Sequence, residues 1–218
     1  MTTILIADDH PLFRAALKQA VEASFADATI HEADSLATLE TLGQQAIPFD
    51  VILLDLHMPG THGFSGLVYL REQYRKVPLV VISATESVDV IQRAIHFGAH
   101  GFIPKSASID TMTDAMRKIM DGERWLPEHA RRAMPPTLPD HSAMSERIAS
   151  LTPQQFRVMG MLMEGMQNKV IAYELDVSEA TIKAHMTAIF RKLGVRNRTQ
   201  AVLALKDLAI EPQGVEGS

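Results

Sequence analysis

The sequence predicts a doubly wound α/β domain on a five-stranded parallel sheet, followed by a smaller all-α domain. Within residues 1–122, short apolar runs alternate with amphipathic stretches, as in a chain of βα units. From Leu151 onward only helical periodicity remains. Four prolines between positions 127 and 139 interrupt any periodicity between the two parts. We therefore expect a first domain at 1–122, a linker at 123–148 and a second domain at 149–218.

Five short apolar runs are the strand candidates: Ile4–Asp8, Thr29–Ala33, Val51–Asp55, Leu79–Ser83 and Gly101–Pro104. The third and fourth are almost wholly apolar, which is typical of strands buried on both faces of a parallel sheet. Between the strands, apolar residues recur at helical spacing. The first and last of these helices are expected to point the following residues inward: Leu12, Ala16 and Val21, then Ile109, Met112, Met116 and Ile119.

The second half reads as consecutive helices, each with a polar residue at its start. A short helix is expected near Ser142, and Thr152, Asn168 and Ser178 are candidate caps of the next three. The helix after Ser178 has the inward stripe Ile182, Met186, Ile189 and Leu193. A last helix is expected from Thr199 to about Leu208, with Ala201, Val202, Leu205 and Leu208 apolar.

Charge is unevenly distributed along the 218 residues, whose formal net charge is −5. The segment from Ala180 to Lys206 has no Asp or Glu, and its basic residues are Lys183, Arg191, Lys192, Arg196, Arg198 and Lys206. Such an asymmetry indicates an anion-binding module. The absence of cysteine excludes disulfides and thiolate metal sites. Because no signal peptide and no apolar stretch of about 18 residues is visible, we expect a cytoplasmic protein without a membrane segment.

Three carboxylates fall at neighbouring strand ends: Asp8 and Asp9 after the first strand, and Asp55 at the end of the third. They would repel one another unless a cation were present, and Mg²⁺ prefers such oxygen ligands. Ser83 and Lys105 end or follow strands at the same edge, where they could position a phosphoryl group. A lone Asp at a strand end is usually a turn former, but the joint placement on four strand ends favours a site.

Two histidines flank this constellation. His10 and His57 lack the spacing of a zinc site, and ordinary surface histidines are the simpler interpretation.

The segment 168–183 reads as helix, tight turn and helix. The second of these helices has an outward face of Glu179, Lys183, Ala184, Thr187 and Arg191. Small and basic side chains on one exposed face can approach base edges in a major groove. Periodicity alone supports a plain helical bundle with a solvated face equally well.

The first domain resembles the receiver domain of two-component response regulators, a flavodoxin-like fold. The resemblance covers about residues 2–122 and is carried by Asp8-Asp9, Leu54-Asp55-Leu56-His57-Met58-Pro59-Gly60, Ser83-Ala84 and Phe102-Ile103-Pro104-Lys105. It implies that Asp55 is the phospho-acceptor. It also implies that Asp9, Asp55 and the backbone carbonyl of His57 bind Mg²⁺, with Asp8 acting mostly through water. Lys105 and Ser83 would contact the phosphoryl group, and Phe102 stands where many receivers have a switch tyrosine.

The second domain resembles the LuxR-type tetrahelical helix-turn-helix, which with the receiver defines the NarL/FixJ group. The resemblance covers about residues 149–208 and is carried by Leu151-Thr152-Pro153, Gly165, Asn168-Lys169, Ile171-Ala172, Ser178, Thr181-Ile182-Lys183-Ala184-His185 and the segment 191–199. It implies a recognition helix at 179–192.

In that helix Lys183, Ala184 and Thr187 would face bases, and Arg191 shares their face. By the same resemblance Asn168, Lys169, Thr181 and His185 lie near the DNA backbone, and the 199–208 helix serves dimerisation. The chain departs from the family pattern at Gln154-Gln155, Val170 and Thr187, so its base preference does not follow from any relative.

We therefore expect a regulator, not an enzyme, in which a sensor histidine kinase phosphorylates Asp55 with Mg²⁺ and so switches promoter DNA binding, with a homodimer in the phosphorylated state. Two alternatives are a Mg²⁺-dependent phosphohydrolase that uses Asp55 as nucleophile, and a regulator that works without phosphorylation. A further hypothesis is that the acidic receiver covers the basic recognition face in the resting state.

Overall fold

In the computed structural model, residues 2–61, 63–133 and 142–206 are described. Five parallel strands form one sheet in the order β2-β1-β3-β4-β5, which confirms the doubly wound fold. The strands are β1 (Thr2–Ala7), β2 (Ala28–Ala33), β3 (Val51–Asp55), β4 (Leu79–Ser83) and β5 (Gly101–Pro104). β3 and β4 are buried along their whole length, as their apolar sequences predict.

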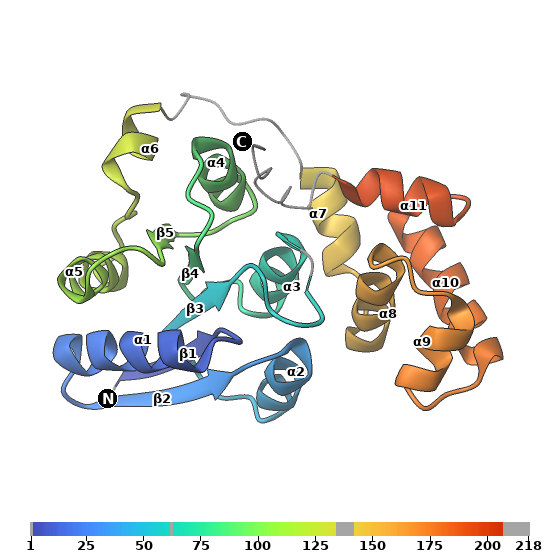
Figure 1. Cartoon of the computed structure of the whole chain (residues 1–218), viewed down its shortest axis with the longest axis horizontal. Helices are drawn as coiled ribbons and strands as arrows, with labels where there is room; N and C mark the ends of the chain where they lie inside the picture. The colour runs from blue at the N-terminus through green and yellow to red at the C-terminus, as the bar shows by residue number, and fades with distance from the viewer. Residues whose placement is uncertain (1, 62, 134–141, 207–218) are drawn as a thin grey trace, which may run out of the picture.

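Helices cover both faces of the sheet (Figure 1). One face packs against α1 (Pro11–Ser24) and α5 (Ile109–Met120), which also contact each other. The other face packs against α2 (Leu36–Gln44), α3 (Ser65–Gln73) and α4 (Val88–His96). Along β1, Ile4 and Ile6 belong to the first core, whereas Leu5 and Ala7 belong to the second. This two-residue alternation gives β1 two buried faces.

The inward stripe of α1 differs from the expected one. Leu17, Ala20 and Val21 are buried, but Leu12 is 89% exposed and Ala16 is only half-buried. The reason is that α1 begins directly after the carboxyl edge of β1, so its first turn overhangs the sheet. Ile109 is exposed for the same reason, since it opens α5 after β5, while the other three residues expected to point inward from α5 are buried.

Part of the predicted linker is folded onto the first domain. Trp125 forms a parallel bridge to Gly101 beside β5, and its carbonyl accepts a hydrogen bond from the Phe102 N–H at 3.0 Å. The helix α6 (Glu128–Ala133) follows, packs against α4 and buries Ala130. The expectation that prolines interrupt any helix in this linker is therefore wrong for Glu128–Ala133, which form α6. α7 (Ser142–Ala149) begins at the residue that the sequence indicated.

The remaining helices are α8 (Pro153–Met163), α9 (Asn168–Glu174), α10 (Glu179–Leu193) and α11 (Arg198–Leu205). Thr152 and Gln155 form a reciprocal capping box at the start of α8, and Ser178 caps α10. Asn168 is not a cap, because it is the first helical residue after Gln167. Asp176 adopts a φ of 51° in the α9–α10 turn, a conformation that aspartate tolerates better than most residues.

The helices on the α2–α4 face of the sheet contact the C-terminal helices through α3. The exposed side of α3 in an isolated receiver would carry Val68 and Tyr69, but both are buried here. Tyr69 stacks on Phe156 of α8 with ring centroids 4.4 Å apart, and α7 packs along α3. One apolar core therefore runs from the α2–α4 face of the sheet into the C-terminal helices. Figure 1 shows α7 and α8 beside α3. In the described part of the chain, every helix falls short of the length and hydropathy needed to cross a bilayer.

Candidate functional site

The predicted site residues gather at the carboxyl edge of the sheet. β1 and β3 are neighbours, so Asp8 and Asp9, which follow β1, lie beside Asp55 at the end of β3. The side chains of Asp8 and Asp55 are each only 1% exposed, whereas that of Asp9 is 29% exposed. A nearby cation is therefore required to stabilise the two buried carboxylates in their charged form.

Lys105 supplies part of that charge. Its Nζ lies 2.7 Å from Asp8 Oδ2 and 2.8 Å from Asp55 Oδ2, and it also sits 5.0 Å above the centre of the Phe13 ring. Burial alone would lower the pKa of Lys105, but its hydrogen bonds and attraction to Asp55 and Asp8 raise that pKa above the ordinary value. The ammonium of Lys105 is thus held in its charged form between two carboxylates. The ion pair between Lys105 and Asp8 was not predicted from the sequence.

Asp55 is held ionised by the same contacts. Burial acts to raise its pKa, but the polar groups of His57 and the charge of Lys105 outweigh burial and lower the pKa of Asp55 below its usual range. Lys105 engages only Oδ2. The other oxygen, Oδ1, is buried without a hydrogen-bond partner in the described residues, and His57 Nδ1 is 3.9 Å from it. Asp55 therefore presents an ionised oxygen that is still free to react or to bind a cation.

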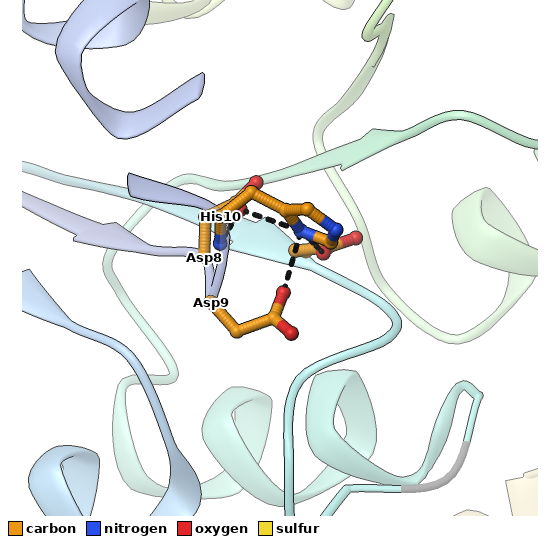
Figure 2. Close-up of side chains that lie close together, drawn as sticks. Asp8, Asp9 and His10 are labelled. Carbon is orange, nitrogen blue, oxygen red and sulfur yellow. Dashed lines mark hydrogen bonds and ion pairs between the residues drawn. The ribbon is translucent and has the colours of Figure 1, made fainter. Parts of the chain in front are cut away.

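The acidic group fits a divalent cation. Asp8, Asp9, His10 and Asp55 each offer one ligand atom, and these atoms lie within 4.8 Å of one another. Three carboxylates face one ammonium, so the cluster retains a net negative charge that a dication would neutralise. Figure 2 shows the His10 ring lying over the two neighbouring aspartates. His10 is 63% exposed, as expected for a surface histidine, but its Nδ1 also contacts the carboxylates of the cluster.

Ser83 and Phe102 occupy buried positions near this cluster. Ser83 ends β4, and its Oγ accepts a hydrogen bond from the Thr85 N–H at 3.1 Å. Its carbonyl accepts a hydrogen bond from the Lys105 N–H at 2.8 Å, which fixes β4 beside the end of β5. The Phe102 side chain is fully buried, so in this structure the aromatic ring points inward.

A cavity of about 700 Å³ opens above Asp55. Its polar wall contains His10, Asp55, His57, Thr85 and Lys105, and its apolar wall is formed by Leu12, Phe13, Ala16 and Ala84. Ala84 follows β4, and the other three residues of the apolar wall come from the first two turns of α1. Leu12 lies in the overhanging first turn, which explains why it is exposed. Sequence periodicity assigned Leu12 and Ala16 to the core and so missed them as cavity residues.

A second candidate surface lies on α10. Lys183, Ala184, Thr187 and Arg191 are exposed on one face, opposite the buried Ile182, Met186, Ile189 and Leu193. Lys183 forms an ion pair with Glu179 at 3.1 Å, one turn earlier. Around this face, Lys169 is exposed, whereas Asn168, Thr181 and His185 are half-buried. The Thr181 hydroxyl also contacts the Ser178 hydroxyl at 2.8 Å, as part of the helix start.

Two of the six basic residues between Ala180 and Lys206 form hydrogen bonds with other helices or loops of the same domain. Lys192 Nζ donates to the Ser150 carbonyl at 2.6 Å and to Gln155 Oε1 at 2.7 Å. Arg198 donates to the Leu162 and Met166 carbonyls at 3.1 and 2.7 Å. These side chains tie the ends of helices together, so the basic surface is smaller than the charge count indicated.

Two expectations about the arrangement of the domains can be compared with the structure. The receiver packs on α7 and α8 and leaves the outward face of α10 exposed, so it does not cover this face in the structure. In α11, Ala201 and Leu205 are buried in the core of their own domain, and Leu208 lies outside the described residues. The exposed apolar residues of α11 are Val202 and Leu203. Of the apolar patch expected for dimerisation, Val202 is exposed, whereas Ala201 and Leu205 are buried within their own domain.

Fold and site together define a class: a receiver-like α/β domain with a buried acidic cluster, joined to a helix-turn-helix bundle. Residues 4–117 match the response regulator receiver domain, and residues 149–205 match the bacterial regulatory proteins of the luxR family. The chain is 41% identical over 213 residues to the glycerol metabolism activator of Pseudomonas putida, covering 95% of this chain and 96% of that protein. The chain belongs to the response regulator family, in the branch with a LuxR-type DNA-binding domain.

Other relatives agree with this assignment. The nitrate/nitrite response regulator protein NarL of Escherichia coli is 31% identical, over 92% of this chain and 93% of that protein. A solved structure of the RcsB response regulator of Salmonella typhimurium has a similar fold, with a TM-score of 0.56 and 20% identity over 94% of this chain and 98% of the other.

Proposed function

We propose that Asp55 is the phospho-acceptor of this regulator. The observation that carries the proposal is its geometry: a buried, ionised carboxylate at the floor of an open cavity, with Lys105 on one oxygen and the other oxygen free. A carboxylate oxygen of Asp55 attacks the phosphorus of the donor, a phosphohistidine of a sensor kinase. The bond from phosphorus to the donor nitrogen breaks, and an acyl phosphate forms.

The residues around Asp55 have three proposed roles: contact with the phosphoryl group, binding of Mg²⁺, and repacking after phosphorylation. Lys105 is close enough to neutralise the incoming charge, and Ser83 ends the neighbouring strand, where its hydroxyl can turn to the phosphoryl oxygens. Asp9, Asp55 and the His57 backbone carbonyl would hold Mg²⁺, with Asp8 acting mostly through water. When bound, Mg²⁺ neutralises the carboxylates and the transferring phosphoryl group. Phe102 would be the aromatic residue that repacks when Asp55 is modified.

We further propose that α10 reads promoter DNA. Lys183, Ala184 and Thr187 would face the bases, with Arg191 on the same face of the helix. Asn168, Lys169, Thr181 and His185 would lie near the DNA backbone. The support is the exposed basic face and the family of the domain. Among solved relatives, RcsB is described in complex with DNA and as dimers bound to two DNAs. We propose that the phosphorylated protein binds this DNA as a homodimer. Its proposed location is the cytoplasm, where the promoter DNA lies.

The functional division of the chain is also a proposal: a receiver at 1–122, a connecting segment at 123–148 and a DNA-binding domain at 149–218. The folding of residues 125–133 onto β5 and α4 implies that this part of the connecting segment moves with the receiver.

The test of the acceptor is labelling by acetyl phosphate with Mg²⁺, followed by intact mass spectrometry. Wild type should gain one acid-labile phosphoryl group, and Asp55→Asn should gain none. Asp27→Asn is the matched control, because Asp27 is exposed just before β2, at the opposite edge of the sheet. A stoichiometric acyl phosphate in Asp55→Asn would refute the assignment. Multiple turnovers of acetyl phosphate by wild type would instead favour a phosphohydrolase.

A further inference from the structure

His10 stands inside the acidic cluster, with its Nδ1 close to one oxygen each of Asp8, Asp9 and Asp55. Its Nδ1 lies 2.7 Å from Asp9 Oδ1, 3.3 Å from Asp8 Oδ1 and 3.9 Å from Asp55 Oδ2. Figure 2 shows the contacts of His10 with Asp8 and Asp9. In an octahedral complex with bonds of about 2.1 Å, adjacent ligand atoms are about 3 Å apart and opposite ones about 4.2 Å apart. The three distances fall in or close to this range, so the nitrogen occupies a position suited to a ligand of the same ion.

The backbone holds the His10 ring in this place. The His10 N–H donates to Asp8 Oδ1 at 2.8 Å, and the His10 carbonyl accepts the first helical hydrogen bond of α1 from the Arg14 N–H. Pro11 follows and restricts the chain at the helix start. The side chain itself is 63% exposed, so it has room for the small rotation that coordination requires.

A second observation independently indicates a cation in this cluster. Asp55 Oδ1 is buried on a side chain that is 1% exposed, and it has no hydrogen-bond partner in the described residues. Leaving a buried carboxylate oxygen without a partner is costly. A metal ion bound in the cluster, whose ligand atoms lie within 4.8 Å of one another, would satisfy Oδ1 while Lys105 stays on Oδ2, the Asp55 oxygen to which the 3.9 Å distance from His10 refers.

We infer that His10 donates an imidazole nitrogen to the metal ion of the acidic cluster, so that the site accepts Mn²⁺ and Co²⁺ as well as Mg²⁺. The inference rests on the proposed function of the cluster and refines its metal chemistry. Sites made only of oxygen ligands suit Mg²⁺, whereas an imidazole nitrogen favours transition ions. His10 takes the place of a water ligand and leaves the carboxylate ligands unchanged.

The test is pulsed electron paramagnetic resonance of Mn²⁺ bound to the full-length protein, because imidazole coordination produces a ¹⁴N modulation. Wild type should show this modulation and His10→Asn should lose it. His57→Asn is the matched control, since His57 is the other histidine beside Asp55, and it should retain the signal. Isothermal titration should show the Co²⁺ affinity of His10→Asn falling on the order of tenfold, with Mg²⁺ affinity changed much less.

The outcomes separate the two proposals. If Mn²⁺ binds and Asp55 is phosphorylated, but wild type has no ¹⁴N modulation or loses it only in His57→Asn, then His10 merely hydrogen-bonds the aspartates and the inference is wrong. If no divalent ion binds and Asp55 is not labelled, the proposed function of the cluster fails as well.

Discussion

The acidic cluster and the face of α10 use charge in opposite ways. In the cluster, Asp8 and Asp55 are buried and share one ammonium, Lys105. On α10, Lys183 and Arg191 are exposed, and Lys183 contacts only a carboxylate of its own helix, Glu179. The cluster is assembled from positions separated by as many as 97 residues, from Asp8 to Lys105, whereas the face of α10 lies on one continuous helix.

The difference follows from the function proposed for each surface. Phosphoryl transfer requires charges that are fixed before the reaction, in a place where water screens them little. DNA binding draws its energy from phosphate contacts that release counterions, so the cations must remain accessible until DNA arrives. Buried pairs are therefore expected to matter for stability, and exposed cations for affinity.

The largest expected effect comes from Lys105→Met, which leaves Asp8 and Asp55 buried without their ammonium. Breaking a buried pair typically costs about 3–5 kcal/mol of folding free energy. Because Mg²⁺ can replace the lost charge, millimolar Mg²⁺ should restore much of the stability in urea denaturation. If Lys105→Met were as stable as wild type in the presence of a chelator, the claim that the buried ion pairs of the cluster stabilise the fold would be wrong.

The ion pair between Lys105 and Asp55 also makes the stability of the fold depend on pH. The pKa of Asp55 in the folded protein is below its ordinary value, so this group stabilises the fold above the ordinary carboxyl pKa and the contribution is lost as pH falls through the folded value. In Lys105→Met the main counter-charge is absent, so the pKa of Asp55 should rise. The acid unfolding midpoint of the variant should therefore shift to higher pH, as measured by circular dichroism in chelator.

An intermediate effect is expected for Lys183→Ala on DNA. Loss of a base contact should cost about 1–3 kcal/mol of binding to an operator selected from random duplexes, and should relax the preference at one position. The melting temperature should hardly change, because Lys183 is exposed.

Lys192→Ala is the matched control for this effect. Lys192 holds the Ser150 carbonyl and Gln155, so its loss should lower the melting temperature of the C-terminal domain. If Lys183→Ala destabilised the protein and Lys192→Ala altered base preference, the assignment of these two lysines would be reversed.

The smallest effect is expected at the contact between the domains. Burial raises the pKa of Glu40, although the charge of Arg157 in α8 opposes this, and Glu40 Oε1 accepts no hydrogen bond from the described residues. A carboxyl with a raised pKa in the docked state favours docking at low pH and disfavours it as pH rises through that pKa. Glu40→Gln should therefore strengthen docking at neutral pH, by less than about 1 kcal/mol.

Energy transfer between dyes on the two domains, recorded from pH 4 to 7, measures this change. Wild type should become more compact on acidification, and Glu40→Gln should show less of that pH dependence. Tyr69 provides a second signal, since burial and then the Glu40 charge raise its pKa to about 12 in the docked state. Undocking should return its ultraviolet titration towards the ordinary value.

Several features were predictable from the sequence because they depend on local pattern. Three strands, β3, β4 and β5, have the predicted bounds, because a strand buried on both faces must be a continuous apolar run. The gathering of Asp8, Asp55 and Lys105 followed from the rule that parallel strands end at one edge. The inward stripe of α10 followed from its 3.6-residue period.

Other features were decided only by the tertiary structure, because they depend on which surfaces meet. No local pattern distinguishes Lys192, which holds a distant carbonyl, from Lys183, which remains in solvent. Leu12 has the spacing of a core residue, yet it overhangs the sheet and lines the cavity. The position of His10 among three carboxylates and the stacking of Tyr69 on Phe156 likewise depend on long-range packing, whose free energy is determined by the folded arrangement and not by neighbours in the chain.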